Sequence, residues 1–379
     1  MRIAFAMINC NRRDGSARAV NEVAERLARR GHDVHLYARK AEDLDLGLVH
    51  WHRVPGPSWP EVADFWSYHH AANALLRRGR FEIIHSIGPN TSQANVVTIQ
   101  NIQPAKREIL RRHAGEEAIS PFRRLTRALY LQVTSNAERR LYTRRPGPLF
   151  LPVSRGVENE LRTHYNIGTS PVRIVPNAAD TAIFHPVSEP ERLAWRRANG
   201  LKDDDIVCLF SGGEWARKGL DLAILALARI PLPRAKLFVA GDDADRERFR
   251  RLADDQGLGG RVLFGGFRKD MATAMAAADV FLFPSHYEAF SLATIEAAAC
   301  GLPILASRIN GTEDFIHPGE NGDFIPHDPE GIAAVLAPLL QNRHAMRAMG
   351  ESGRRLVETR YTWDQVAALT EEAYQSIRK

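Results

Sequence analysis

Short apolar runs alternate along the chain with segments whose apolar residues recur at helical spacing. Five runs in the first half predict buried strands, at residues 3–8, 33–37, 82–87, 95–99 and 149–153. Between the first two, residues 18–30 have the periodicity of an amphipathic helix, and Gly31 follows as a helix stop. The opening of the chain therefore predicts a β-α-β unit.

The second half repeats this alternation. Its apolar runs predict further strands, at residues 206–213, 236–243, 262–267, 279–284 and 303–307. Pro176, Asn177 and Pro186 interrupt regular structure between the halves. Strands that alternate with helices form parallel sheets covered on both faces, so we expect an α/β protein of two doubly wound Rossmann-like domains. Such folds bind ligands beyond the carboxyl ends of their strands, which favours a central cleft as the site.

Composition narrows the class of protein. Of the 379 residues, 44% are apolar and 25% are charged, as in ordinary globular domains. No apolar run reaches the roughly 18 residues of a membrane span, and the N-terminus predicts a strand, so we expect a cytoplasmic protein. The three cysteines, Cys10, Cys208 and Cys300, are odd in number and far apart, which predicts buried thiols rather than a disulfide or a zinc site.

Positive charge gathers in the first half. Residues 1–175 hold 27 Lys and Arg against 16 Asp and Glu, a net charge of +11 in a chain whose total is +6. Residues 101–147 have a net charge of +7 and contain an apolar stripe at helical spacing, made of Phe122, Leu125, Leu129, Val133 and Ala137. Such a basic helix suits an anionic membrane surface, or its stripe packs on the domain core. No nucleic-acid motif or aromatic platform accompanies the charge, so we expect no nucleic-acid partner.

Common enzyme motifs are absent from the sequence. The turn after the first strand lacks G-x-G-x-x-G, and neither a P-loop nor a G-x-S-x-G sequence occurs. The informative stretch is EAFSLATIE, where Glu288 and Glu296 flank a predicted helix start whose free backbone N–H groups suit a phosphate. This spacing places the carboxylates on the order of 10 Å apart, which suits the two hydroxyl-rich ends of a nucleotide sugar. A capping glutamate and a surface glutamate are the structural alternative.

The sequence around this stretch resembles the retaining glycosyltransferases of family 4, which have the GT-B fold. AAACGLPILAS follows the E-x7-E pair as an EA-x-A-x-G-x-P-like run, and VPNAAD matches the interdomain sequence. The resemblance covers nearly the whole chain and is strongest to the lipopolysaccharide-core glucosyltransferase branch, through FSGGEWARKGLDLAILAL and SPFRRLTRALY. It implies an acceptor-binding domain of residues 1–177 plus 361–379, which includes a returning C-terminal helix, and a nucleotide-sugar-binding domain of residues 178–360.

The resemblance assigns donor-binding residues in the second domain. Glu288 would contact the hydroxyls of the donor sugar, and Glu296 would contact those of the ribose. Phe290, Ser291 and Leu292 would offer backbone amides to the diphosphate.

Two glycine-containing loops complete the expected donor site. Gly15 and Ser16 match the flexible loop after the first strand, which closes over the donor phosphates in the family. Residues 265–266, Phe267 and Arg268 match the loop that frames the nucleobase, mainly through backbone groups.

The chain departs from the family pattern at two positions. In GGEWARKG, Lys218 matches the family lysine, whereas Gly213, a candidate donor-binding residue, replaces the usual arginine. Arg217 is our candidate for the second cation, so Glu288, Arg217 and Lys218 form the expected catalytic set that stabilises the leaving nucleoside diphosphate. Without the resemblance, Arg217 and Lys218 would be a solvated helix start. Gln100 stands where many members have a histidine, and it either orients the acceptor or lines the acceptor side of the site.

These residues predict a function and leave one alternative. We expect a metal-independent retaining hexosyltransferase that uses a nucleotide sugar such as a UDP- or GDP-hexose, needs no further cofactor, and acts on a glycolipid or polysaccharide precursor at the inner face of a membrane. The D-x-D sequences within residues 203–205 and 242–245 hold a metal in other glycosyltransferase folds, but side chains supply the positive charge in this family. The changes at Gly213 and Gln100 motivate the alternative, a catalytically silent nucleotide-sugar sensor or membrane scaffold.

Overall fold

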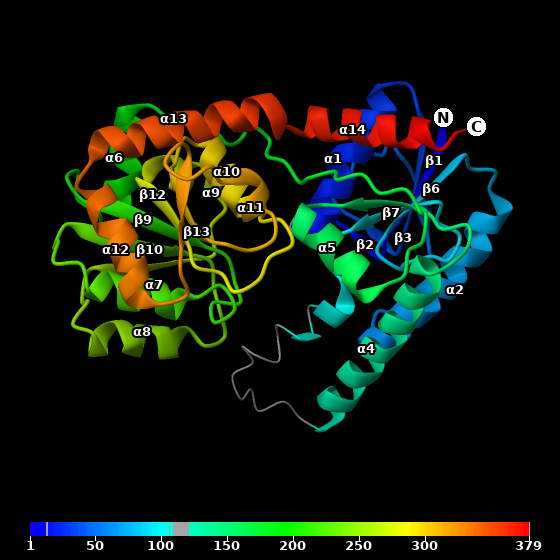
Figure 1. Cartoon of the computed structure of the whole chain (residues 1–379), viewed down its shortest axis with the longest axis horizontal. Helices are drawn as coiled ribbons and strands as arrows, with labels where there is room; N and C mark the ends of the chain where they lie inside the picture. The colour runs from blue at the N-terminus through cyan, green and yellow to red at the C-terminus, as the bar shows by residue number, and fades with distance from the viewer. Residues whose placement is uncertain (13, 106, 109–120, 379) are drawn as a thin grey trace. The chain divides into compact units, whose positions relative to one another are not determined.

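A computed structural model describes residues 1–12, 14–105, 107–108 and 121–378 (Figure 1). The chain forms two compact units, Met1–Asn177 with Trp363–Lys379, and Ala178–Thr362. Each unit contains a parallel six-stranded sheet with helices packed against it. The expected pair of doubly wound Rossmann-like domains is confirmed.

The sheet of the first unit has the strand order β5-β3-β1-β6-β7-β8, and every neighbouring pair is parallel. Its strands are β1 (Arg2–Ala6), β3 (Asp33–Ala38), β5 (His50–Arg53), β6 (Ile83–Ile87), β7 (Val96–Ile99) and β8 (Leu149–Pro152). Two short strands, β2 (Asn9–Cys10) and β4 (Lys40–Ala41), form a separate parallel pair. The central strands are buried on both faces, which explains their continuous apolar sequences.

Helices from both ends of the chain complete the first unit. They include α1 (Gly15–Arg29), α2 (Glu61–Arg78), α4 (Pro121–Tyr142), α5 (Arg155–His164) and α14 (Trp363–Ser376). Helix α14 packs against α1 although the two are far apart in sequence (Figure 1). The ion pairs Arg26–Asp364 at 3.0 Å and Arg30–Glu371 at 2.9 Å join the two helices.

The second unit repeats the doubly wound pattern with the strand order β11-β10-β9-β12-β13-β14. Its strands are β9 (Ile206–Ser211), β10 (Ala235–Ala240), β11 (Val262–Gly266), β12 (Val280–Phe283), β13 (Ile304–Ser307) and β14 (Gly322–Ile325). Its helices are α6 (Glu189–Ala198), α7 (Leu220–Ala228), α8 (Arg246–Asp255), α9 (Met271–Ala277), α10 (Leu292–Ala299), α11 (Thr312–Phe315), α12 (Pro329–Leu340) and α13 (Arg343–Arg360).

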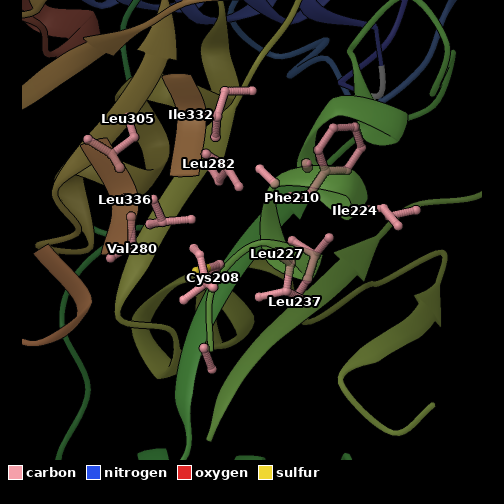
Figure 2. Close-up of a cluster of buried hydrophobic side chains, with 14 of the residues drawn as sticks. Cys208, Phe210, Ile224, Leu227, Leu237, Val280, Leu282, Leu305, Ile332 and Leu336 are labelled. Atoms are coloured by element: carbon pink, nitrogen blue, oxygen red, sulfur yellow. The ribbon is translucent and has the colours of Figure 1, made fainter. Parts of the chain in front are cut away.

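The core of the second unit lies between its sheet and helices α7 and α12. Figure 2 shows aliphatic and aromatic side chains from these elements in one cluster, among them Cys208, Phe210, Leu227, Leu282 and Leu336. The tight packing of this cluster fixes the strand ends and loops that carry the candidate site. All three cysteines of the chain are buried and free, as predicted.

Helix α4 buries a different face from the predicted apolar stripe. Thr134, Glu138 and Leu141 are buried, whereas Leu125 is 59% exposed and Leu129 is 47% exposed. Two polar groups on the buried face are hydrogen bonded, because the Thr134 hydroxyl donates to a backbone carbonyl and Glu138 accepts two hydrogen bonds. The interpretation of the stripe as a core face is therefore wrong at Leu125 and Leu129.

Part of the basic segment lies outside the described residues. This applies to residues 106 and 109–120, and to the side chains of residues 121–124. Within the part of the chain that is described, every helix is too short or too polar to cross a bilayer.

Candidate functional site

The two candidate cations and Glu288 form one cluster in the second unit. Glu288 lies between β12 and α10, and Arg217 and Lys218 directly precede α7. Arg217 Nη1 donates to Glu288 Oε1 at 2.9 Å and to the backbone carbonyl of Tyr287 at 2.5 Å. Lys218 Nζ lies 4.0 Å from the same Glu288 oxygen. One carboxylate oxygen thus faces both cations.

Neither cation is a solvated helix start. The Arg217 side chain is 17% exposed and that of Lys218 is 15% exposed. Burial lowers the pKa of Lys218, and Arg217 adds to this, while Glu288, Glu214 and Glu296 oppose it. Burial also disfavours the charged form of Arg217, but Glu288 and Glu214 outweigh this and raise its pKa. The cluster therefore concentrates charge in a site from which water is largely excluded.

Two glycines allow the close approach of this cluster. Gly212 has φ +118°, and a Cβ there would lie 2.2 Å from Lys218 Nζ. Gly219 has φ +72° at the start of α7, where a Cβ would lie 2.2 Å from the carbonyl oxygen of Pro284. Any larger residue would strain the backbone and displace either the lysine or the loop that leads to Glu288.

The start of α10 has the form expected for anion binding. Ser291 is its N-cap, and the Ser291 hydroxyl accepts a hydrogen bond from the Thr294 backbone N–H at 3.3 Å. Leu292 is the first residue of the helix, and Glu296 is buried within it. The N-terminal N–H groups that a helix cannot satisfy itself, together with two nearby cations, can hold a phosphate.

Among the other predicted donor-site residues of the second unit, Phe290 and Arg268 have structural partners. Phe290 is buried, and its ring lies 5.9 Å from that of Tyr361. Arg268 pairs with both carboxylate oxygens of Asp270 at 2.8 and 2.5 Å, so its guanidinium is already engaged. Phe267 is 76% exposed. At Gly213, which replaces the usual arginine, a Cβ would lie 3.2 Å from the backbone oxygen of Asp242. The turn is therefore closely packed at this position.

The first unit brings together Ser16 and Gln100. Both line a cavity of about 30 Å³, room for a single water, between α1, α14 and the sheet. The Gln100 amide nitrogen donates to the side-chain oxygen of Asn177 at 3.3 Å. Gly15 and Ser16 form the first turn of α1 rather than a flexible loop, because the helical hydrogen bonds begin at the Asp14 carbonyl. The expectation of a free loop at these two residues is wrong.

The two acidic runs have structural roles. Asp203 pairs with Arg197, and the Asp243 carboxylate accepts hydrogen bonds from the backbone N–H groups of Trp215 and Asp245, both at 2.9 Å. Over the described ranges, no three His, Cys, Asp or Glu side chains are grouped so as to hold a metal ion.

The prediction missed Glu214 as part of the cluster. Glu214 Oε2 accepts hydrogen bonds from Arg217 Nε at 3.1 Å and Nη2 at 2.8 Å. The i, i+3 spacing of a glutamate and an arginine was the available signal. This spacing alone does not predict the ion pair, because the turn, with its two glycines, has no helical pattern in the sequence.

Two family models match the chain in sequence and between them cover most of it. Residues 13–183 match Glycosyltransferase Family 4, and residues 191–356 match Glycosyl transferases group 1. The structure of WaaG, a glycosyltransferase involved in lipopolysaccharide biosynthesis, has a TM-score of 0.80 at 24% identity and covers 99% of both chains. Anabaena HepE in complex with UDP-glucose has a TM-score of 0.75 at 17% identity and covers 100% of both chains. These two likenesses establish the fold.

Curated relatives differ in how much of this chain their sequences match. The D-inositol 3-phosphate glycosyltransferase of Acidothermus cellulolyticus is 29% identical, over 91% of this chain and 82% of that protein. The lipopolysaccharide glucosyltransferase WaaG of Escherichia coli is 34% identical, over 44% of this chain and 46% of that protein. An uncharacterised glycosyltransferase of Methanocaldococcus jannaschii is 29% identical, and the chain spans 59% of its length.

The chain belongs to glycosyltransferase family 4 and has the GT-B fold. Within that family it resembles the lipopolysaccharide-core glucosyltransferase branch, as its sequence predicts.

Proposed function

We propose that this glycosyltransferase moves a hexose from a nucleotide sugar to a hydroxyl of a glycolipid or polysaccharide precursor, with retention at the anomeric carbon and without a metal ion. The observation that carries the proposal is the largely buried cluster of Arg217, Lys218 and Glu288 beside the start of α10. It offers positive charge for a diphosphate and a carboxylate for sugar hydroxyls at the same place.

The proposed chemistry follows from these charges. The bond between the anomeric carbon and the diphosphate oxygen breaks, so negative charge develops on the leaving nucleoside diphosphate. Arg217 and Lys218 stabilise this charge, and each fixed cation in a dry site contributes about 2–4 kcal/mol. The acceptor oxygen bonds to the anomeric carbon on the same face, and its proton passes to the leaving phosphate. Gln100 cannot take that proton, in keeping with this route.

The proposed classes of donor and acceptor are inferred from similar proteins. UDP-glucose is the first donor to test, because HepE, which shares the fold, is known in complex with it. A lipid-linked acceptor is favoured because similar proteins act in lipopolysaccharide synthesis. Leu125 and Leu129 lie one turn apart on α4 and are exposed, and the segment around them is basic, which suits contact with an anionic membrane surface.

Hydrolysis of the donor in the absence of acceptor tests the catalytic assignment. We expect the wild-type chain to release UDP from UDP-glucose or GDP from GDP-mannose in the presence of EDTA, with the sugar product first formed in the α configuration. Lys218→Met, which removes the charge but keeps most of the stem, is expected to lower this rate by about 100-fold or more. Glu288→Ala is also expected to lose activity.

Lys202→Ala serves as the matched control, because Lys202 is an exposed lysine of the same unit. Equal rates in Lys218→Met, Glu288→Ala and the control would refute the site. Release only after a divalent cation is added would refute the metal-independent mechanism.

A further inference from the structure

The guanidinium of Arg217 is held along both of its edges. Nη1 faces Glu288 and the Tyr287 carbonyl, whereas Nε and Nη2 both donate to Glu214 Oε2, at 3.1 and 2.8 Å. The Nε–Nη2 edge is the fork with which arginine grips carboxylates and phosphates. Glu214 therefore occupies the part of Arg217 that is best suited to an incoming diphosphate.

The two carboxylates that hold Arg217 differ in burial. The Glu288 side chain is 19% exposed, but that of Glu214 is 70% exposed. Ion pairs in water contribute little, because solvent screens them and ordering long side chains costs entropy. The contact with Glu214 is therefore the one that an anionic ligand can replace.

The backbone does not favour a glutamate at this position. Glu214 has φ +52°, the left-handed region in which L side chains are strained. The turn is fixed instead by buried Trp215, whose backbone N–H donates to Asp243 and whose indole N–H donates to the Gly212 carbonyl at 2.8 Å. Because Glu214 is exposed and its backbone is strained, its contribution to the site is the carboxylate that pairs with Arg217, not packing in the core.

Charge also balances within the cluster. Arg217 and Lys218 carry two positive charges, and Glu214 and Glu288 carry two negative ones. If a diphosphate replaces Glu214 at Arg217, a group with at least two negative charges takes the place of one carboxylate, and Glu288 stays in contact with the cations.

We propose that Glu214 is a built-in placeholder for the donor diphosphate. It holds the Nε–Nη2 edge of Arg217 in the nucleotide-free enzyme, gives way when the diphosphate binds, and returns as the nucleoside diphosphate leaves. This inference rests on the proposed function, because it takes Arg217 as a ligand of the diphosphate. Its consequence is that Glu214 weakens the retention of the product.

Titration calorimetry of the full chain with UDP tests the placeholder directly. Removal of a competing carboxylate is expected to tighten UDP binding by about threefold in Glu214→Gln, the scale of one exposed ion pair. Glu214→Gly is expected to tighten binding to a similar extent. Glycine tolerates the left-handed backbone, so this second variant keeps the fold. Comparing the two variants distinguishes the effect of losing the carboxylate from the effect of relieving backbone strain.

Asp242→Asn is the matched control. Asp242 is an exposed acidic residue whose backbone lies beside Gly213, and its carboxylate faces Arg246 rather than Arg217. Its substitution is expected to leave the dissociation constant for UDP unchanged. In an Arg217→Ala background, Glu214→Gln is expected to have no effect, because the competition acts through Arg217.

Three results would overturn the placeholder: no tightening in the Glu214 variants, equal tightening in Asp242→Asn, or tightening that persists without Arg217. In each of these the wild-type chain still binds UDP, so the proposed function stands. A wild-type chain that binds neither UDP nor GDP would overturn the proposed donor site together with this inference.

Discussion

Two carboxyl groups illustrate how a residue's surroundings decide its chemistry. Glu288 faces two cations, whereas Glu138 on α4 is buried, and among the described residues no cation pairs with its carboxylate. The Glu138 carboxylate accepts one hydrogen bond from the Tyr165 hydroxyl at 2.6 Å and another from the Gln103 backbone N–H at 3.2 Å. Burial raises the pKa of Glu138 to about 7, although both hydrogen bonds oppose the shift.

The raised pKa of Glu138 makes the stability of the first unit depend on pH. The folded chain holds this proton up to about pH 7, whereas the unfolded chain releases it near the ordinary pKa of 4.5. The free energy of unfolding should therefore fall as pH rises between these two values, by up to about 3 kcal/mol. In Glu138→Gln, which keeps an acceptor oxygen, this part of the fall should disappear.

Urea unfolding at about pH 5 and about pH 8 measures the effect. Glu158→Gln is a suitable control, because Glu158 is a partly exposed glutamate of the same unit, paired with Arg162. If wild-type and Glu138→Gln chains lose stability equally between the two pH values, the account of Glu138 is wrong.

At the scale of elements, the sequence predicts the central strands and misses two edge strands. Strand β5 has the sequence HWHR and lies at the edge of its sheet beside β3, and β14 has the sequence GDFI and lies at the edge of its sheet beside β13. An edge strand is held on one side by backbone hydrogen bonds and does not need a continuous apolar sequence. Hydrophobic pattern alone therefore could not identify either strand.

The exposed leucines of α4 give a prediction for that helix. We expect the full chain to bind vesicles that contain phosphatidylglycerol at low salt and to bind less at high salt, because the attraction is screened. The double variant Leu125→Ser/Leu129→Ser is expected to bind more weakly, since it loses apolar contact with the bilayer while its charge is unchanged.

Ile183→Ser provides the control, because Ile183 is 53% exposed in the second unit. Vesicle binding that is absent at low salt, or reduced equally by the control, would contradict the membrane role of α4.

Across the whole molecule, the sequence predicts which residues are candidates for the site better than it predicts which residues they contact. The E-x7-E spacing predicts that Glu288 and Glu296 flank a helix start, and Glu288 lies in the loop before α10 while Glu296 lies within that helix. Arg217 could be chosen as the second cation because it is adjacent to Lys218. The bond between Arg217 and Glu214 depends on a left-handed turn, which no periodicity reveals. The same limit explains why Gly15 was expected in a loop and lies in a helix.

The central claim is that Arg217 and Lys218 bind the diphosphate of a nucleotide sugar, beside a Glu288 carboxylate that contacts its sugar. Thermal unfolding with UDP, UDP-glucose, GDP and GDP-mannose in EDTA, for the wild-type chain and Lys218→Met, tests it most directly. A nucleotide at about 100 times its dissociation constant should stabilise the wild-type chain by about 2.7 kcal/mol, and Lys218→Met should lose most of this gain. No stabilisation by any of the four, or equal stabilisation of both chains, would contradict the claim.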